Sequence, residues 1–315
     1  MTEHVTSPHD GPDAELAAII GERRRLVGLA YRLLGSLAEA EDAVQETYTR
    51  WYALSRRQQD AVESPGAWLT TVATRVCLDL LGSARVRRER YVGEWIPEPL
   101  PGRTDWISGR PATDATRCAD PADRVTLDES VSMAFLVVLD SMTPAQRVAL
   151  VLHDVFGYPF AEIAGITGRT PAACRELASA ARRRVRDALP PEVPAPHRAE
   201  LVRRFRQAWD ARDIDALVGL LSPDATLTAD GGGVVPAALH PIHGGEGIAH
   251  YLTDLATRAA GALTLLERTV NGRPGLVVAY EGTAAAVYAF DVEADRITHI
   301  WAVRNPEKLR PWTAE

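Results

Sequence analysis

The chain has 315 residues, of which 46% are hydrophobic and 24% are charged, and its formal net charge is −7. These values are typical of a globular protein with two or three domains, each large enough to bury a core of its own. They exclude a disordered chain, and the acidic balance argues weakly against a protein that coats nucleic acid without selectivity.

The N-terminal residues, MTEHVTSPHDGPDAE, are polar and acidic. They contain neither the basic nor the apolar region of a signal peptide, and no later stretch has the length of a membrane span. We therefore expect a cytoplasmic protein. The three cysteines, Cys77, Cys118 and Cys174, are odd in number and widely spaced, which fits core residues in a reducing compartment better than a disulfide or metal framework. No metal and no cofactor are expected.

Helical periodicity begins at residues 14–34, where leucines recur on one face, and Gly35 predicts the end of this helix. Ser36 is the predicted N-cap of a second helix, at residues 37–52, with Glu39 completing a capping box. The apolar positions of this second helix leave one polar face exposed. That face carries Asp42, Gln45 and Glu46.

A third helix is predicted to begin at Ser64 and Pro65 and to end in the basic stretch SARVRRERY at residues 83–91. Arginines in such a tail hold phosphates, and a tyrosine stacks on an unpaired base. A solvated helix end is an equally good interpretation of this stretch alone. The candidate nucleic-acid contacts of this region are Arg75, Arg85, Arg87, Arg88 and Tyr91.

Regular periodicity fails at residues 92–126, which contain five prolines and the motif WIPEP at residues 95–99. A connector of this length is either disordered or extended along a partner. Helices resume near residue 127. A further helix is predicted to start at Thr143 and Pro144 and to bury apolar residues as far as Val155.

Residues 160–186 predict two short helices joined by a tight turn at Gly168, with Thr170 as N-cap of the second helix. This is the pattern of a helix-turn-helix, whose second helix reads the major groove of DNA. An ordinary helical hairpin with a solvated arginine face is the alternative. The residues predicted to face DNA are Thr170, Ala172, Arg175, Glu176, Ser179, Arg182 and Arg183.

The proline-rich spacer PPEVPAP marks a domain boundary. Two amphipathic helices follow it, and then five strand-like segments with one further helix among them. This order predicts an α+β domain with a mostly antiparallel sheet.

Six motifs in this order resemble the extracytoplasmic-function (ECF) sigma factors of bacterial RNA polymerase, and more narrowly the SigJ-type subgroup with a C-terminal SnoaL-like domain. They are LVGLAYRLLGSLAEAEDAVQETYTRWY, SPGAWLTTVATRVCLDLL, WIPEP, the helix-turn-helix, DGGG and NPEKL. The resemblance implies a mainly α fold with two helical sigma domains, the second carrying the helix-turn-helix, and a C-terminal α+β SnoaL-like cone. Its implied boundaries are 14–91 for sigma region 2, 92–126 for the linker, 127–189 for sigma region 4, 190–197 for the spacer and 198–311 for the SnoaL-like domain.

The resemblance also implies functions for these residues. Asp42, Gln45 and Glu46 would bind the β′ clamp helices of core RNA polymerase, the basic region ending at Tyr91 would melt and hold the promoter −10 element, and the recognition helix would read the −35 element. The C-terminal domain would regulate the other two, and RNA synthesis itself would be catalysed by the polymerase. The implied interdomain contacts are Trp95, Pro97, Asp230, Gly231, Asn305, Pro306 and Lys308.

Two other functions remain open from the sequence. A SnoaL-like cone commonly encloses a pocket, so the third domain is a candidate for binding or converting a small molecule. The chain as a whole is also a candidate for a stand-alone helix-turn-helix regulator that senses a ligand. The residues that would line such a pocket are Asp230, His240, His243, Tyr251 and Trp301.

Overall fold

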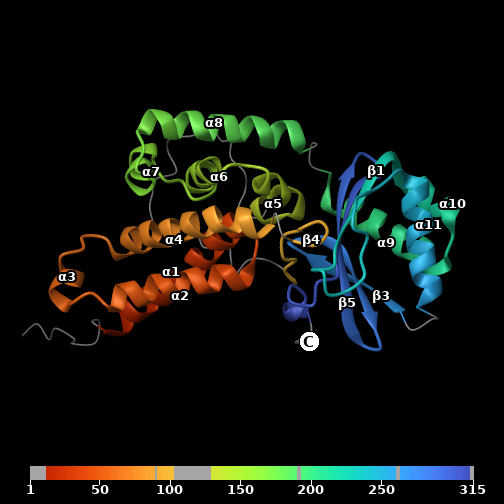
Figure 1. Ribbon diagram of the computed structural model, residues 1–315, viewed down its shortest axis with the longest axis horizontal. Helices are drawn as coiled ribbons and strands as arrows, with labels where there is room; N and C mark the ends of the chain where they lie inside the picture. Colours follow the sequence, from red (N-terminus) through yellow and green to blue (C-terminus); the bar gives the residue numbers. More distant parts are fainter. Residues whose placement is uncertain (1–11, 89–90, 103–128, 190–192, 260–262, 313–315) are drawn as a thin grey trace, which may run out of the picture.

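The computed structural model describes residues 12–88, 91–102, 129–189, 193–259 and 263–312. Two layers of helices lie at one end of an elongated molecule, and a sheet with its own helices lies at the other end (Figure 1). The predicted architecture of two helical units followed by an α+β domain is therefore confirmed.

The first helical unit contains one helix more than the sequence predicted. A short helix is added after the second one, where Ser55 and Gln58 form a capping box. Gly35, at φ 74°, ends the first helix, and the Ser36 hydroxyl accepts a hydrogen bond from the backbone N–H of Glu39. The helices are α1 (Pro12–Leu34), α2 (Leu37–Tyr52), α3 (Arg56–Asp60) and α4 (Pro65–Arg88).

The second helical unit differs from the prediction between Thr143 and Val155. The predicted single helix ends at Leu150 and continues as a π-helical turn, which carries one extra residue per turn. The elements are η3 (Glu129–Val131), α5 (Met133–Asp140), α6 (Pro144–Leu150), η4 (Val151–Val155), α7 (Phe160–Thr167) and α8 (Pro171–Ala188).

Helices α7 and α8 form the predicted helix-turn-helix. Gly168 ends α7 in the left-handed conformation, with φ 66°, which a residue without Cβ adopts at little cost. Thr170 caps α8, because its hydroxyl accepts a hydrogen bond from Ala173 N at 3.2 Å. The buried face of α8 carries Cys174, Ala178 and Ala181.

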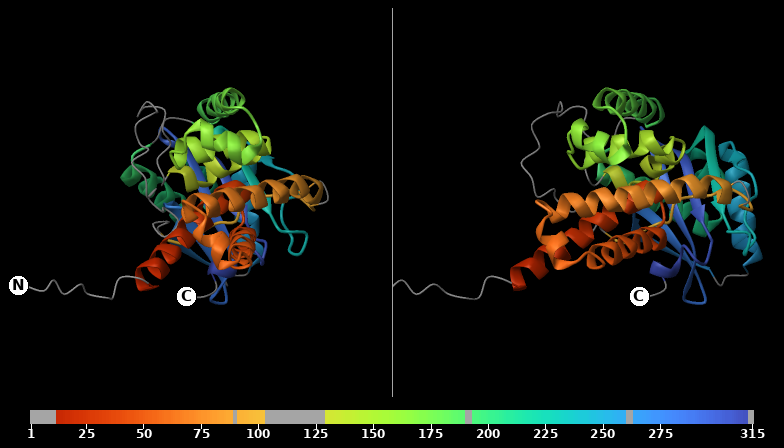
Figure 2. Two further views of the ribbon diagram at one scale, coloured as in Figure 1. Left: turned by 90° about the vertical axis from the view of Figure 1, so that its left-hand side faces the viewer. Right: turned by 60° about the vertical axis from the view of Figure 1, so that its left-hand side comes forward.

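The two helical units share one hydrophobic core. Leu26 and Leu29 of α1 and Leu69 of α4 belong to the same buried cluster as Phe135 of α5 and Val148 of α6. Figure 2 shows the second unit lying across the first in two further views. The units therefore pack directly against each other along the length of α1 and α4.

The third domain combines three helices with a six-stranded sheet of order β2-β1-β6-β5-β4-β3. Neighbouring strands are antiparallel except β1 and β6, which are parallel. The elements are α9 (Ala195–Ala211), α10 (Ile214–Leu220), β1 (Leu221–Asp230), β2 (Ile242–His243), α11 (Gly245–Arg258), β3 (Leu263–Val270), β4 (Arg273–Tyr280), β5 (Thr283–Glu293) and β6 (Arg296–Val303).

Each face of this sheet is covered by a different part of the chain. Tyr288 points toward helices α9 to α11, where its ring lies 5.1 Å from that of Trp209. Trp301 points to the opposite face, in a smaller cluster with Ile96 of the linker and Met133 of α5. Alternation along the strands therefore directs one face to the domain core and the other to the helical units.

None of the helices in the described ranges combines the length and the apolar character that crossing a bilayer requires. Cys77 and Cys174 are fully buried, as expected for core residues, and burial raises the pKa of the Cys77 thiol. Cys118 lies outside the described residues.

Candidate nucleic-acid and polymerase surfaces and the interdomain junction

The polar face of α2 is open to solvent. Asp42, Gln45 and Glu46 are all exposed, while Val44 and Tyr48 on the opposite side of the helix are buried. Glu46 accepts a hydrogen bond from Arg50 at 2.9 Å, one turn further along. This face is therefore accessible to a partner, and its assignment to the polymerase stays a prediction.

The outer face of α8 gathers most of the residues predicted to read DNA. Ala172, Arg175, Glu176, Ser179 and Arg183 line one surface depression together with Ala180. The guanidinium of Arg175 lies over the ring of Phe160, 5.4 Å from its centre, which orients the side chain from the preceding helix. Thr170 lies at the start of this face, where it serves as the N-cap.

Arg182 lies apart from this surface depression, which corrects its placement on the outer face. Its Nε and Nη2 donate to both carboxylate oxygens of Asp154, at 2.8 and 2.6 Å. The Asp154 side chain is only 1% exposed, and a buried carboxylate needs such a partner. Position 182 lies one turn after the buried Ala178, so it falls at the edge of the inner face.

Arg75, a predicted −10 contact, bonds to the helix-turn-helix in this structure. Its guanidinium donates to the carbonyl oxygens of Gly165 and Ile166, at 3.1 and 3.2 Å. These carbonyls lie at the C-terminal end of α7, where the helix dipole favours a cation. The side chains of Arg85, Arg87 and Arg88 lie outside the described part of the chain.

Tyr91, which is also a predicted −10 contact, is half-buried against the third domain. Its hydroxyl donates to Asp230 Oδ1 at 2.6 Å and accepts from Asn305 Nδ2 at 2.9 Å. Burial, followed by the hydrogen bond to Asp230, raises the pKa of Tyr91. In this arrangement the ring is engaged at the domain junction.

Asp230 is the centre of that junction and is 0% exposed. Its Oδ2 accepts from Lys308 Nζ at 2.7 Å and from the backbone N–H of Ile96 at 3.1 Å, and Lys308 also donates to the Ile96 carbonyl at 2.6 Å. The three predicted interdomain motifs thus meet at one carboxylate. We call this group the interdomain latch; it consists of Tyr91, Trp95, Ile96, Asp230, Asn305 and Lys308.

The other predicted interdomain residues shape the loops around the latch. A Cβ added to Gly231 would lie 2.3 Å from the carbonyl oxygen of Val235, so the loop after Asp230 tolerates only glycine there. Pro97 packs against Gly35, at the end of α1. Pro306 is exposed and begins a turn, in which its carbonyl accepts from Leu309 N.

Asn271 was missed by the sequence analysis. It is fully buried in the turn between β3 and β4, and its side chain accepts from Leu100 N at 2.9 Å and donates to Tyr31 and to the Val131 carbonyl, each at 2.8 Å. One side chain therefore joins the first helical unit, the linker and the second helical unit. The Asn-Gly pair at 271–272 signals a hairpin turn, but no sequence signal identifies the turn's partners.

Glu98 was also missed, and its carboxylate caps the N-terminus of α2 from the linker. Its Oε2 accepts from Leu37 N at 2.7 Å and from the Ser36 hydroxyl at 3.1 Å, at the N-terminus of α2. Burial raises the pKa of this carboxyl, and its hydrogen bonds oppose that shift. The linker is thus fixed to the helix that carries the predicted polymerase face.

The linker also extends the sheet of the third domain. Gly102 N donates to the Thr269 carbonyl at 3.0 Å, and Pro101 forms an antiparallel bridge with Val270. Strand β3 is the edge of the sheet, so these bonds satisfy backbone groups that would otherwise be open. This is the addition of an extended segment to a sheet edge.

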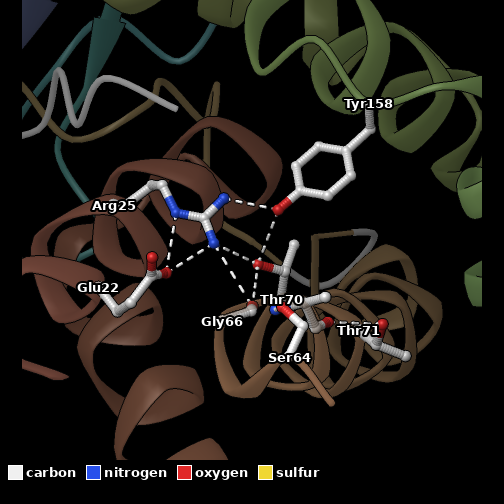
Figure 3. A network of polar contacts seen from close by, with 8 residues as sticks. Glu22, Arg25, Ser64, Gly66, Thr70, Thr71 and Tyr158 are labelled. Carbon is white, nitrogen blue, oxygen red and sulfur yellow. Dashed lines mark hydrogen bonds and ion pairs between the residues drawn. The ribbon is translucent and has the colours of Figure 1, made fainter. Parts of the chain in front are cut away.

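Buried arginines join the two helical units. Arg25 of α1 donates to Tyr158 at 2.6 Å, to Thr70 of α4 at 2.7 Å and to Glu22, as Figure 3 shows. Arg147 of α6 donates to the Leu33 carbonyl at 2.6 Å, and its burial lowers its pKa to about 10. Each guanidinium thus satisfies polar atoms across an otherwise apolar interface.

Three of the residues proposed to line a ligand pocket in the third domain lie in different places, which corrects that set of lining residues. Tyr251 packs with the helix-side core, whereas Trp301 packs on the opposite face of the sheet, and Asp230 belongs to the latch. His299, which was not considered, stacks on Trp301 at 4.4 Å and bonds to Thr228 at 3.0 Å. Its burial, with a smaller effect from His243, lowers its pKa to about 4.

Three family models match the sequence: Sigma-70 region 2 at residues 20–87, Sigma-70 region 4 at 132–185 and a SnoaL-like domain at 202–309. The chain is 38% identical over 299 residues to the ECF RNA polymerase sigma factor SigJ of Mycobacterium tuberculosis, covering 91% of this chain and 90% of that protein. It is 35% identical over 312 residues to the probable ECF RNA polymerase sigma factor SigI of the same species, covering 98% of each. The crystal structure of M. tuberculosis SigJ matches with a TM-score of 0.71 at 33% identity, covering 94% of this chain and 98% of that one.

Proposed function

The chain belongs to the ECF sigma factors of RNA polymerase, and from this premise we propose that its SnoaL-like domain holds the two sigma domains in a closed arrangement that must open before a promoter is engaged. The exposed face with Asp42, Gln45 and Glu46 binds the clamp helices of core polymerase. The recognition helix reads the −35 element, and the basic end of α4 holds the −10 element. The SnoaL-like domain acts as a regulator and not as an enzyme.

The packing of the two sigma domains on one core carries this proposal. Promoter elements named −10 and −35 lie about 25 base pairs apart, which is roughly 85 Å along straight B-form DNA. Here Arg75 of the first sigma domain bonds directly to Gly165 of the second, at 3.1 Å. The two domains cannot occupy both elements while they remain in contact, so promoter binding requires their separation.

The contacts made in the closed arrangement support the same order of events. Arg75 is bonded to α7 and Tyr91 to Asp230, so two of the proposed −10 contacts are engaged within the chain. The polar face of α2 is open. A closed chain can therefore meet core polymerase first and release its −10 contacts afterwards.

Run-off transcription with purified core polymerase tests the proposal. We expect a promoter-specific transcript from the full chain and a higher yield from Asn271→Ala, because that substitution removes bonds to both sigma domains and to the linker. Affinity for core polymerase should be unchanged, since Asn271 is fully buried whereas the α2 face is exposed. Equal yields would remove the regulatory function. Tight operator binding with no transcript would favour a stand-alone regulator instead.

A further inference from the structure

Lys308 is unusual in this chain because it is the only lysine. Of the 35 Lys and Arg residues, 34 are arginines, and the single lysine lies in the interdomain latch. We infer that the latch is a binding site for a small organic ammonium ion, and that the Lys308 side chain is its built-in occupant. The inference of binding depends only on geometry, whereas its consequence for transcription rests on the proposed function.

The surroundings of the Lys308 ammonium are those of an aromatic cage. Its Nζ lies 4.3 Å from the centre of the Trp95 ring and 5.3 Å from that of Tyr91. Asp230 supplies the counter-charge at 2.7 Å, and the Ile96 carbonyl accepts a further hydrogen bond at 2.6 Å. Aromatic faces with a nearby carboxylate are the chemistry by which proteins recognise alkylammonium and quaternary ammonium ligands.

A cavity of about 500 Å³ opens onto this cage, between the N-terminus of α2, the linker and the C-terminal segment. Tyr91, Trp95 and Lys308 lie in its wall. The charged residues in its lining are three acidic ones, Glu39, Glu98 and Glu307, and two basic ones, Lys308 and Arg310. This excess of acidic residues in the lining favours a cationic guest over an anionic one.

The occupant is suited to displacement. An ammonium on a flexible four-carbon stem is a compact point charge, whereas a planar guanidinium would hold its carboxylate through two parallel bonds. A ligand that takes the cage removes Lys308 from Asp230 and from the Ile96 carbonyl. Lys308 and Asp230 both belong to the third domain, whereas the Lys308 bond to the Ile96 carbonyl ties the linker to that domain. The ligand would therefore loosen the latch on its linker side.

Chemical rescue tests the site in the full chain. Lys308→Ala deletes the atoms of n-propylammonium from the cage, so we expect this variant to bind n-propylammonium at least about 10-fold more tightly than n-propanol by titration calorimetry. Lys308→Met is the matched control, because its neutral side chain fills the same space and should abolish the preference. Equal binding of amine and alcohol by Lys308→Ala would overturn the inference.

The wild-type chain gives a second test that does not depend on the folding of a variant. Because Lys308 is the only lysine, acetylation by an N-hydroxysuccinimide ester, read by peptide mass, reports its exposure without interference from other lysines. Tetramethylammonium chloride should accelerate this labelling about threefold or more relative to sodium chloride at equal ionic strength. 3,3-Dimethylbutanol, a neutral molecule of similar shape, should have no such effect.

An unchanged labelling rate in tetramethylammonium would exclude an exchangeable occupant of the cage. Neither test contains DNA or polymerase, so their outcome is independent of the transcription assay. Ligand binding with an unaltered transcript yield would refute the regulatory function and leave the ammonium site in place.

Discussion

The junction between the two sigma domains is broad and apolar, whereas the junction with the SnoaL-like domain is polar at its centre. The first is one continuous core, with arginines such as Arg25 bonding across it. The second depends on two fully buried polar residues, Asp230 and Asn271, beside a small apolar cluster. Apolar contacts weaken gradually on displacement, but buried hydrogen-bond networks are satisfied in one arrangement only. The third domain is therefore the part better suited to act as a switch.

The strongest way to break the polar junction is Asp230→Ala. The substitution leaves the Lys308 ammonium buried without its carboxylate, and we expect it to lower the free energy of unfolding by about 3–5 kcal/mol. Urea denaturation of the full chain measures this change. Asp224→Ala, at a polar residue of the same strand outside the latch, is the control and should stay within about 0.5 kcal/mol. A similar loss in both variants would show that the strand, and not the latch, is sensitive.

A comparable substitution on the helical side is Arg182→Ala, which leaves the buried Asp154 carboxylate unpaired. We expect it to lower the free energy of unfolding by about 2–3 kcal/mol, because the arginine is partly exposed. Arg183→Ala, the next residue on the same helix, should leave stability unchanged. It should instead weaken DNA binding evenly across sequences. It should also reduce, by about one, the slope of the logarithm of the binding constant against the logarithm of the salt concentration. An unstable Arg183→Ala would contradict this division of tasks.

Asn271→Ala tests the second polar residue. Loss of its side-chain bonds should lower the free energy of unfolding by about 1–3 kcal/mol and increase hydrogen exchange at the linker. Glu281→Ala is the matched control, since Glu281 also has a positive φ in a hairpin turn but is exposed. Equal effects would mean that the backbone of the turn, rather than the interdomain bonds, is responsible.

Lowering the pH should destabilise the third domain before it destabilises the sigma domains. The pKa of His299 is lowered to about 4 in the folded chain, below its value of about 6.5 in the unfolded chain. Its contribution to the free energy of unfolding is therefore fully present above pH 6.5 and is lost as the pH falls toward 4. Between pH 7 and pH 5 we expect the free energy of unfolding to fall by about 1–2 kcal/mol, and His299→Gln should abolish this fall. Chemical denaturation followed by tryptophan fluorescence at each pH measures the effect. A pH dependence that survives the substitution would point to another group.

The smallest effect on stability is expected at the open face of α2. Asp42→Ala and Gln45→Ala should change the free energy of unfolding by less than about 0.5 kcal/mol, because both side chains are exposed. They should nevertheless weaken binding to core polymerase in surface plasmon resonance. Glu63→Ala, at an exposed acidic residue outside α2, is the control and should bind normally.

Short sequence patterns were enough to predict most of the secondary structure. The glycine at 168 and the threonine at 170 mark the helix-turn-helix because cap and turn chemistry act over a few residues. The helix-turn-helix face was found for the same reason, apart from Arg182. The inward turn of Arg182 depends on Asp154, which lies 28 residues earlier and gives no local sign of its burial.

The domain junctions could not be derived from periodicity, because their contacts join residues far apart in the chain. The DGGG, WIPEP and NPEKL motifs were placed at an interface through the family resemblance, and the structure brings them to one carboxylate. Asn271 pairs with Tyr31, 240 residues away, and Glu98 caps a helix 61 residues before it. Such pairings depend on how complete domains dock, so no window of sequence contains them.

The third domain follows the recognition helix almost at once, since α8 ends at Ala188 and α9 begins at Ala195. A domain tethered by so short a segment has an effective concentration on the order of millimolar at its partner domains, whatever the amount of protein in the cell. If the third domain restrains the sigma domains as proposed, overproduction of the chain would not relieve that restraint. A separately encoded inhibitor would be overwhelmed under the same conditions. On the proposed function, activation would therefore require a change in the state of each molecule rather than in the ratio of two gene products.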